Sequence, residues 1–145
     1  MPTIPYLHFR GHCAEALEFY AEVFGGTDLR LMRYADAPDM PDAMQDPTRV
    51  IHGQVRLGSA LLMASDYPPG MDGDEQKAVS VMQGVVSVAA GHEVFARLAE
   101  GGSVITAFGP SFFSDGFGMV RDRFGTHWMI SVMPEDEADM LPDPR

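Results

Sequence analysis

Apolar and polar residues follow an order that occurs twice along the chain. In each half an apolar strand comes first, an amphipathic helix follows, and three further strands close the half. The first half is expected to contain strands at 4–10, 28–34, 50–57 and 60–64, with a helix at 13–24. The second half is expected to contain strands at 79–89, 104–108, 116–122 and 127–132, with a helix at 91–100.

Both helices are expected because apolar residues recur at helical spacing and form one buried stripe. The two stripes consist of Leu17, Tyr20, Val23 and Phe24 in the first helix, and of Val94, Phe95, Leu98 and Ala99 in the second. A Gly-Gly pair follows each helix, at 25–26 and at 101–102, and signals its end. Segment 36–48 contains three prolines and is expected to be a loop.

The repeated order predicts an α+β fold built from two βαβββ modules. Neither half is expected to bury its sheet alone, so the modules should pair as a curved, mostly antiparallel mixed sheet, a half-barrel cup with flanking helices. We interpret 1–145 as one domain, with a first module at about 3–66, a linker at 67–77, a second module at about 78–133 and an acidic tail at 134–145. The turn glycines Gly58 and Gly125, 67 positions apart, are predicted to occupy the same slot.

Net charge and composition exclude several classes of partner. The formal net charge is −11, and no Lys/Arg cluster offsets it, so nucleic acid and anionic membrane surfaces are not expected as partners. No apolar run reaches the length of about 18 residues that a membrane-spanning helix needs. A single cysteine, Cys13, rules out an internal disulfide and a multi-cysteine metal site. We expect a cytoplasmic protein.

Three blocks of the sequence carry a resemblance to a known family. They are Pro5–Tyr20, Ile51–Gly58 and Gly116–Ile130, and the last is the most specific. With them the chain resembles the PhnB-like group of the vicinal oxygen chelate superfamily, which includes glyoxalases, ring-cleaving dioxygenases and fosfomycin- or bleomycin-resistance proteins. His12 stands where this group usually has Asn. The resemblance implies a paired-module fold and a homodimer.

The resemblance also implies where a metal would bind. The superfamily's metal centre uses His or Glu on the first and last strands of the modules, and the matching positions here are Pro5, Gln83, Leu62 and Met129. Only Gln83 offers an oxygen, whereas a catalytic divalent site needs about three protein ligands, usually His or carboxylate. No cofactor is therefore predicted, and a divalent metal is disfavoured. His8, at an odd offset from Pro5, is expected on the opposite face of its strand.

On the third strand of the first half, His52, Gln54 and Arg56 share one face. If this face lines the cup, an imidazole and a guanidinium there suit an anionic or carbonyl-bearing ligand. The equally weighted alternative is a structural His52 and an Arg56 that extends to solvent.

In the second half, Met119 and Arg121 share a face of the equivalent strand, and Phe112, Phe113 and Phe117 precede them. These aromatics either close over a flat ligand or, as we favour, form core or subunit contacts. Met129 is expected to face the cup. Trp128 is expected to pack under the helices, and His127 to lie exposed beside a turn.

Cys13 begins the first helix, where backbone N–H groups favour a thiolate. A nucleophilic Cys13 is one hypothesis, and a small buried apolar residue is the favoured alternative. This group has often carried the label of a demethylubiquinone methyltransferase. The sequence does not support it, because no glycine-rich strand-to-helix loop with a downstream acid is found.

The sequence thus favours a binding protein that holds a small organic or anionic molecule in the sheet cup without the usual metal site. His52, Gln54, Arg56, Gln83, Phe112, Phe113, Met119, Arg121 and Met129 are its candidate ligand-binding residues. The alternative is an enzyme of the glyoxalase or resistance-protein kind, a lyase, isomerase or transferase that uses His52 or an unforeseen metal site. A third reading is an interaction protein whose own side chains fill the cup.

Overall fold

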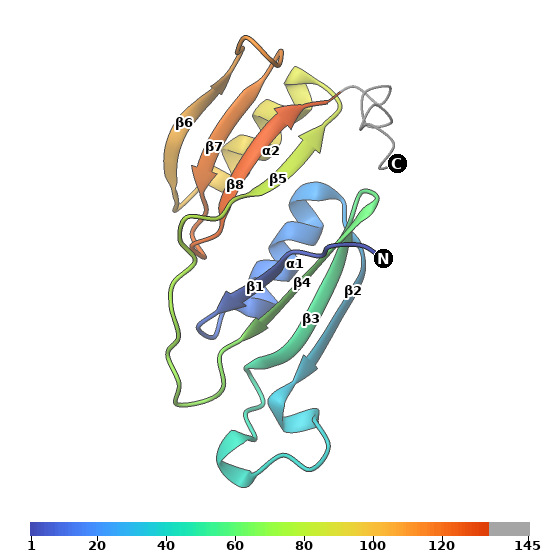
Figure 1. The fold of residues 1–145 in the computed structure, drawn as a ribbon, viewed down its shortest axis with the longest axis vertical. Helices are drawn as coiled ribbons and strands as arrows, with labels where there is room; N and C mark the ends of the chain where they lie inside the picture. The colour runs from blue at the N-terminus through green and yellow to red at the C-terminus, as the bar shows by residue number, and fades with distance from the viewer. Residues whose placement is uncertain (134–145) are drawn as a thin grey trace. The chain divides into compact units, whose positions relative to one another are not determined.

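The structure, a computed structural model, describes residues 1–133 of the 145-residue chain. Two compact units are found, Met1–Lys77 and a second that begins at Ala78. Each unit follows the order strand, helix and three strands, and each forms a mixed four-stranded sheet that is not closed into a barrel (Figure 1). The α+β class and the two βαβββ modules are therefore confirmed. The expected tail at 134–145 lies outside the described residues.

The first unit consists of β1 (Tyr6–Phe9), α1 (Cys13–Phe24), β2 (Thr27–Arg33), β3 (Val50–Leu57) and β4 (Ala60–Asp66). Its strand order is β1-β4-β3-β2, with β1 parallel to β4 and the other pairs antiparallel. The apolar stripe of α1 packs against one face of this sheet, and no helix of the first unit, residues 1–77, packs on the other face (Figure 1). In the predicted loop between β2 and β3, two short 3-10 helices occur, η1 (Tyr34–Asp36) and η2 (Asp42–Met44).

The second unit consists of β5 (Val81–Val85), α2 (Val88–Ala99), β6 (Ser103–Gly109), β7 (Phe117–Arg121) and β8 (His127–Val132). Its strand order is β5-β8-β7-β6, which repeats the pattern of the first unit. The parallel pair is β5 with β8, and α2 packs on one face of this sheet (Figure 1). Trp128 and Ile130 are fully buried, as expected for residues that point towards the helix.

The predicted strand at 79–89 is wrong at its end, because Val88 and Ala89 belong to α2. The cause is Ser87, whose side-chain oxygen accepts a hydrogen bond from the backbone N–H of Ala90 at 3.1 Å. Such a cap fixes the start of a helix immediately after the serine. The apolar composition of 85–89 had favoured a strand, and the local cap outweighs it.

In each unit a buried aspartate joins neighbouring segments by hydrogen bonds. Asp66, at the end of β4, accepts hydrogen bonds from the backbone N–H groups of Gly11, Cys13 and Val50 at 2.8–3.0 Å. It thereby joins the start of α1 to the start of β3. In the second unit Asp122 follows β7 and accepts from the N–H groups of Phe124 and Thr126 and from the indole N–H of Trp128. Both side chains are almost fully buried, so these bonds replace the water that each carboxylate loses.

A glycine on the third strand of each sheet lets the helix approach closely. A Cβ at Gly53 would lie 2.7 Å from the Leu17 side chain, and one at Gly118 would lie 2.7 Å from the Phe95 ring. These glycines therefore occupy equivalent positions on β3 and β7. Over residues 1–133, no helix is both long and apolar enough to cross a bilayer.

Candidate functional site

The face of the first sheet that is turned away from α1 carries most of its polar side chains. We call it the first open face. Strand register assigns to it Arg30, Met32, His52, Gln54, Arg56, Leu61, Met63, Ser65, Tyr6 and His8. The prediction that His52, Gln54 and Arg56 share a face is confirmed, since they alternate along β3 with the buried Gly53 and Val55.

Tyr6, His52 and Gln54 form a hydrogen-bonded chain across the first open face. The Tyr6 hydroxyl lies 3.0 Å from His52 Nδ1, and His52 Nε2 lies 3.4 Å from Gln54 Oε1. An amide oxygen can only accept, so Nε2 carries the proton of the neutral imidazole and Nδ1 accepts from Tyr6. Tyr6 is exposed and the two β3 side chains are half-buried, so a ligand can reach this chain from solvent.

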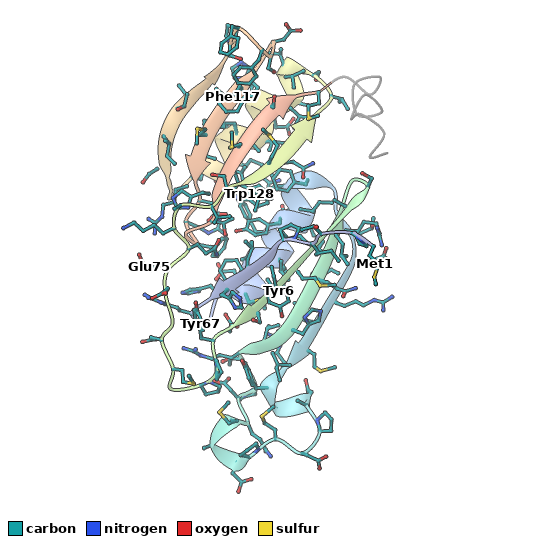
Figure 2. The ribbon with its side chains drawn as sticks, in the orientation of Figure 1. Met1, Tyr6, Tyr67, Glu75, Phe117 and Trp128 are labelled. Atoms are coloured by element: carbon teal, nitrogen blue, oxygen red, sulfur yellow. The ribbon has the colours of Figure 1, made fainter. Side chains whose placement is uncertain are left out.

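His8 also lies on the first open face, which corrects the expectation that it points to the opposite side. Its ring stacks on Tyr67 at 5.5 Å between centroids and lies 5.2 Å from the Tyr6 ring. The Ser65 hydroxyl lies 3.5 Å from its Nδ1. Figure 2 labels Tyr6 and Tyr67 in this unit. The error arose because the count started at Pro5, which precedes the strand.

Arg56 is a weaker candidate than the sequence indicated. Its Nε lies 3.5 Å from a carboxylate oxygen of Asp28, and both side chains are about half exposed. Such an exposed pair contributes little to stability, but it partly neutralises the guanidinium. Arg30 supplies a second guanidinium on this face, beside the neutral groups of Tyr6, His52 and Gln54.

The second sheet also has a face turned away from its helix, which we call the second open face. Its residues on β5, β7 and β8 are Met82, Gly84, Phe117, Met119, Arg121, His127, Met129 and Ser131. Met119 pairs with Met129, which in turn pairs with Met82, so three thioethers lie in one row across three adjacent strands. The expectation that Met119 and Arg121 share a face is confirmed, and Met129 lies on the same face.

Gln83 does not lie on the second open face. It pairs with Ile130 and shares its side of the sheet, the side packed against α2. Met82 takes the open position that the sequence analysis gave to Gln83. The amide of Gln83 donates to the backbone carbonyl of Gly84 at 3.1 Å.

Arg121 and His127 pair directly across β7 and β8 on the second open face. Among the residues that the structure describes, the Arg121 guanidinium makes no hydrogen bond or ion pair. His127 Nδ1, within the same described residues, is a buried polar atom without a hydrogen-bond partner. His127 is half-buried, not exposed as expected.

The three predicted aromatics form one cluster. The Phe113 ring lies 4.9 Å from that of Phe117 and 5.1 Å from that of Phe112, and both contacts are edge-to-face. Phe112 is fully exposed and Phe113 is 56% exposed, so neither belongs to the core. Phe117 belongs to the second open face and joins the cluster to it (Figure 2).

Cys13 is completely buried. Burial raises the pKa of its thiol, and the nearby Asp66 carboxylate raises that pKa further. The thiol is therefore protonated at neutral pH, because removal from water disfavours the thiolate. The structure supports the favoured alternative, a small buried side chain, against the nucleophile.

The model of a family described as 3-demethylubiquinone-9 3-methyltransferase matches residues 2–131. Protein YjdN of Escherichia coli is 31% identical over 93% of this chain and 97% of its own length. The chain belongs to this family.

Two solved structures resemble this PhnB-like chain. Protein PA1353 from Pseudomonas aeruginosa is 37% identical and has a TM-score of 0.83, with 93% of this chain and 99% of that chain covered. A PhnB protein from Bacillus cereus is 21% identical with a TM-score of 0.73, over 92% and 100% of the two chains, and shows the shared fold. The resemblance to the PhnB-like group of the vicinal oxygen chelate superfamily is thus confirmed.

The four positions that the superfamily implies for a metal do not fit a divalent cation in this PhnB-like chain. Leu62 is 2% exposed and faces α1, and Gln83 faces α2. Pro5 precedes β1, and Met129 offers only a soft thioether. Within residues 1–133, no three His, Cys, Asp or Glu side chains form a metal-binding group.

Equivalent positions on the last strands of the two units are 66 residues apart, one fewer than the predicted 67. With Gly53 and Gly118 equivalent, the register makes Met63, not Leu62, the counterpart of Met129. The cause is the turn between the last two strands. Between the equivalent pairs Arg56–Leu61 and Arg121–His127, the chain has four residues in the first unit and five in the second. A count from the turn glycines missed this difference.

Sequence reasoning overlooked Tyr6 and Met82, which occupy the same position on β1 and β5. The signal was present in β1, because Leu7 and Phe9 are the apolar residues of an alternating strand. Their burial against α1 turns Tyr6 and His8 to the other side. In β5 the signal was weaker, because the sequence Val-Met-Gln-Gly-Val has no alternation of apolar and polar residues.

Proposed function

We propose that this chain binds a small organic molecule with a carbonyl or carboxylate group on its first open face. The support is the Tyr6–His52–Gln54 chain, which holds donors and acceptors in fixed order on an accessible surface. Binding sites commonly combine apolar side chains with a few well-placed polar groups. Met32, Met63 and Leu61 supply the apolar part beside the polar chain.

His52 is the central group of the proposed site. Gln54 fixes the imidazole tautomer, so Nδ1 and the Tyr6 hydroxyl form one donor–acceptor pair at the surface. A carbonyl oxygen of the ligand can accept from the Tyr6 hydroxyl in place of His52 Nδ1. The superfamily's usual metal is not part of the proposal, because the four implied positions do not form a ligand set.

The test uses 2-oxobutanoate as the probe, because it carries both a ketone and a carboxylate. Binding is followed by isothermal titration calorimetry, which measures the affinity of the unchanged protein and of the variants in the same way. His52→Gln, which keeps a polar side chain, should weaken binding about tenfold, the effect of one lost hydrogen bond to a charged or polarised group. Equal affinity of His52→Gln and the unchanged protein would remove the proposal.

The matched control is His12→Gln. His12 lies at the start of α1 with a side chain 65% exposed, outside the first open face. Its replacement should leave the affinity for 2-oxobutanoate unchanged. Thermal unfolding of both variants shows that the comparison is made on folded protein. In addition, mass spectrometry of molecules released from purified protein would identify a ligand that co-purifies.

A second candidate function, acid–base catalysis, is favoured by the direction of the Tyr6–His52 bond. As the Tyr6 oxygen takes a proton from carbon next to the ketone, its own proton can pass to His52 Nδ1. The test is hydrogen–deuterium exchange at C3 of 2-oxobutanoate in D2O, followed by proton NMR. Both Tyr6→Phe and His52→Gln should abolish any accelerated exchange. An exchange rate equal to that of buffer supports binding without catalysis.

Methyl transfer, which the family description names, is not what the geometry favours. Methyl donors of the nucleotide type commonly bind at the carboxyl ends of parallel strands beside a glycine-rich loop. Within residues 1–133 each sheet has one parallel pair, β1–β4 or β5–β8, and presents an open face instead. The homodimer stays a prediction, to be checked by analytical ultracentrifugation.

A further inference from the structure

The second open face changes its chemistry in steps along the strands. The first row holds Arg121 and His127, the second holds the three methionines, and the third begins with Phe117. Successive rows are two residues apart, a distance of roughly 7 Å along a strand. A cationic end, a thioether middle and an aromatic end therefore follow one another on one surface.

The cationic end has side-chain hydrogen-bonding groups that are available to a ligand. The Arg121 guanidinium is half-buried and has no partner among residues 1–133, and its planar fork suits a carboxylate. His127 beside it has a buried, unpartnered Nδ1. A buried N–H without an acceptor is costly, which favours the proton on Nε2, a nitrogen that can then donate to a bound anion. The two side chains together can hold one carboxylate.

The middle of the second open face suits a flat apolar body. Met82, Met119 and Met129 are flexible and polarisable, and thioethers make favourable contacts with aromatic rings. Met82 is 50% exposed, and the other two are half-buried. Met133 adds a fourth thioether, because its Sδ lies 3.1 Å from the position of a Cβ at Gly84, on the open side of β5.

We infer that the second open face binds a planar aromatic carboxylate, with the carboxylate on Arg121 and His127 and the rings over the methionine row. The row spacing of roughly 7 Å matches one or two fused rings beyond the carboxyl group. The choice of an anion rests on charge complementarity with the unpartnered guanidinium. The inference concerns a different sheet from the proposed function and is independent of it.

The test uses 2-naphthoate as the probe and protein labelled with 13C at the methionine methyl groups. Each methyl signal is assigned by single Met→Leu variants. Ring currents of a bound naphthalene should shift the methyl signals of Met82, Met119 and Met129. The methyl signals of Met32 and Met63, on the first open face, should remain in place.

Charge is tested by Arg121→Gln, which should weaken 2-naphthoate binding about tenfold, while Arg121→Lys should retain most of the affinity. Neutral 2-naphthamide should bind the unchanged protein about as weakly as 2-naphthoate binds Arg121→Gln. The charge-matched control is Arg97→Gln, because Arg97 lies on α2, on the other side of the sheet. It should bind like the unchanged protein.

Three results would overturn the inference. One is unchanged affinity in Arg121→Gln, and another is a set of shifts that avoids the methionine row. The third is a shift of these methyl signals with protein concentration instead of with 2-naphthoate, which would assign the face to a second copy of the chain. If Arg121→Gln does not fold, Met129→Leu replaces it, with a loss of the naphthoate-induced shift at Met119 or Met82 as the readout. Binding of 2-oxobutanoate and its loss in His52→Gln are unaffected by any of these results.

Discussion

At the position of His52 on β3 the second sheet has Phe117 on β7, and at the position of Gln54 it has Met119. Tyr6 on β1 corresponds in the same way to Met82 on β5. The first open face is thus a polar, hydrogen-bonded surface, whereas the second is a surface of thioether and aromatic groups.

The scaffolds beneath the two faces differ much less. Gly53 and Gly118 are both glycine where the helix approaches the sheet, and Ser65 corresponds to Ser131. Arg56 and Arg121 also occupy equivalent positions, but only Arg56 has an ion-pair partner among the residues that the structure describes. Packing against a helix restricts the covered face, whereas the open face is free to differ. The two proposed ligand sites therefore lie on the faces that differ, not on the faces that pack against a helix.

The largest expected effect tests whether both scaffolds depend on their buried carboxylate. Asp66→Asn and Asp122→Asn should each lower the free energy of unfolding by about 3 kcal/mol, because an amide nitrogen would replace a buried carboxylate oxygen that accepts hydrogen bonds. Urea unfolding followed by circular dichroism measures both losses. Fluorescence of Trp128, the single tryptophan, reports on the second unit.

Asp115→Asn is the control for this pair, because Asp115 is exposed and should change the free energy of unfolding by less than about 0.5 kcal/mol. A loss below about 1 kcal/mol in either buried variant would show that the carboxylate is not what fastens that unit.

Alanine in place of either glycine should lower the free energy of unfolding by a smaller amount, which should differ between Gly53 and Gly118. The Cβ of Gly118→Ala would lie 2.9–3.0 Å from backbone atoms of Phe108, which cannot move away alone, so we expect a loss of about 2–3 kcal/mol. At Gly53 the nearest atoms are the ends of the Leu17 and Leu31 side chains, and a loss of about 1 kcal/mol is expected. Denaturant unfolding measures both, with Gly109→Ala, which meets nothing within 4 Å, as the control. A larger loss at Gly53 than at Gly118 would contradict this reading.

Exchange of residues between the open faces should change the free energy of unfolding still less. Gln54→Met and Met119→Gln should each change the free energy of unfolding by no more than about 0.5–1 kcal/mol, because these half-exposed positions are not packed against a helix. The same unfolding experiment applies, and Leu62→Gln, on the covered face, is the destabilised reference. A loss as large as that of Leu62→Gln would mean that the open faces also determine the fold.

The smallest effect concerns the segment between β2 and β3, which carries two 3-10 helices that the β6–β7 connection does not match. Hydrogen bonds from the Thr48 hydroxyl and from the backbone N–H groups of Arg49 and Thr48 lower the pKa of Asp46 to about 2. The ordering of this turn is therefore fully present above the ordinary pKa of 3.8 and is lost as the pH falls through about 2.

A carbon-13 NMR titration of the Asp46 carboxyl group checks this value. Thr48→Val should raise the midpoint towards the ordinary value, since it removes the hydroxyl donor, whereas Thr106→Val in the second unit should not. An unaltered midpoint in Thr48→Val would assign the shift to the backbone donors alone.

Local patterns predicted most of the fold. The helix at 13–24 and the strand at 50–57 have the predicted bounds, because apolar spacing and flanking glycines act over a few residues. The face shared by His52, Gln54 and Arg56 followed from strand alternation alone. Gln83, His8 and Leu62 were placed on the wrong face, because a shift of one residue reverses every side chain of a strand.

The sequence by itself determined two βαβββ modules, their helices, their family and the candidate strands, since these depend on periodicity and short motifs. Only the tertiary structure decided which face each side chain occupies. It also decided that Tyr6 contacts His52, that Asp28 forms an ion pair with Arg56 and that three methionines form one row. Those relations join residues 10–47 positions apart in the chain, and the register of the strands sets them.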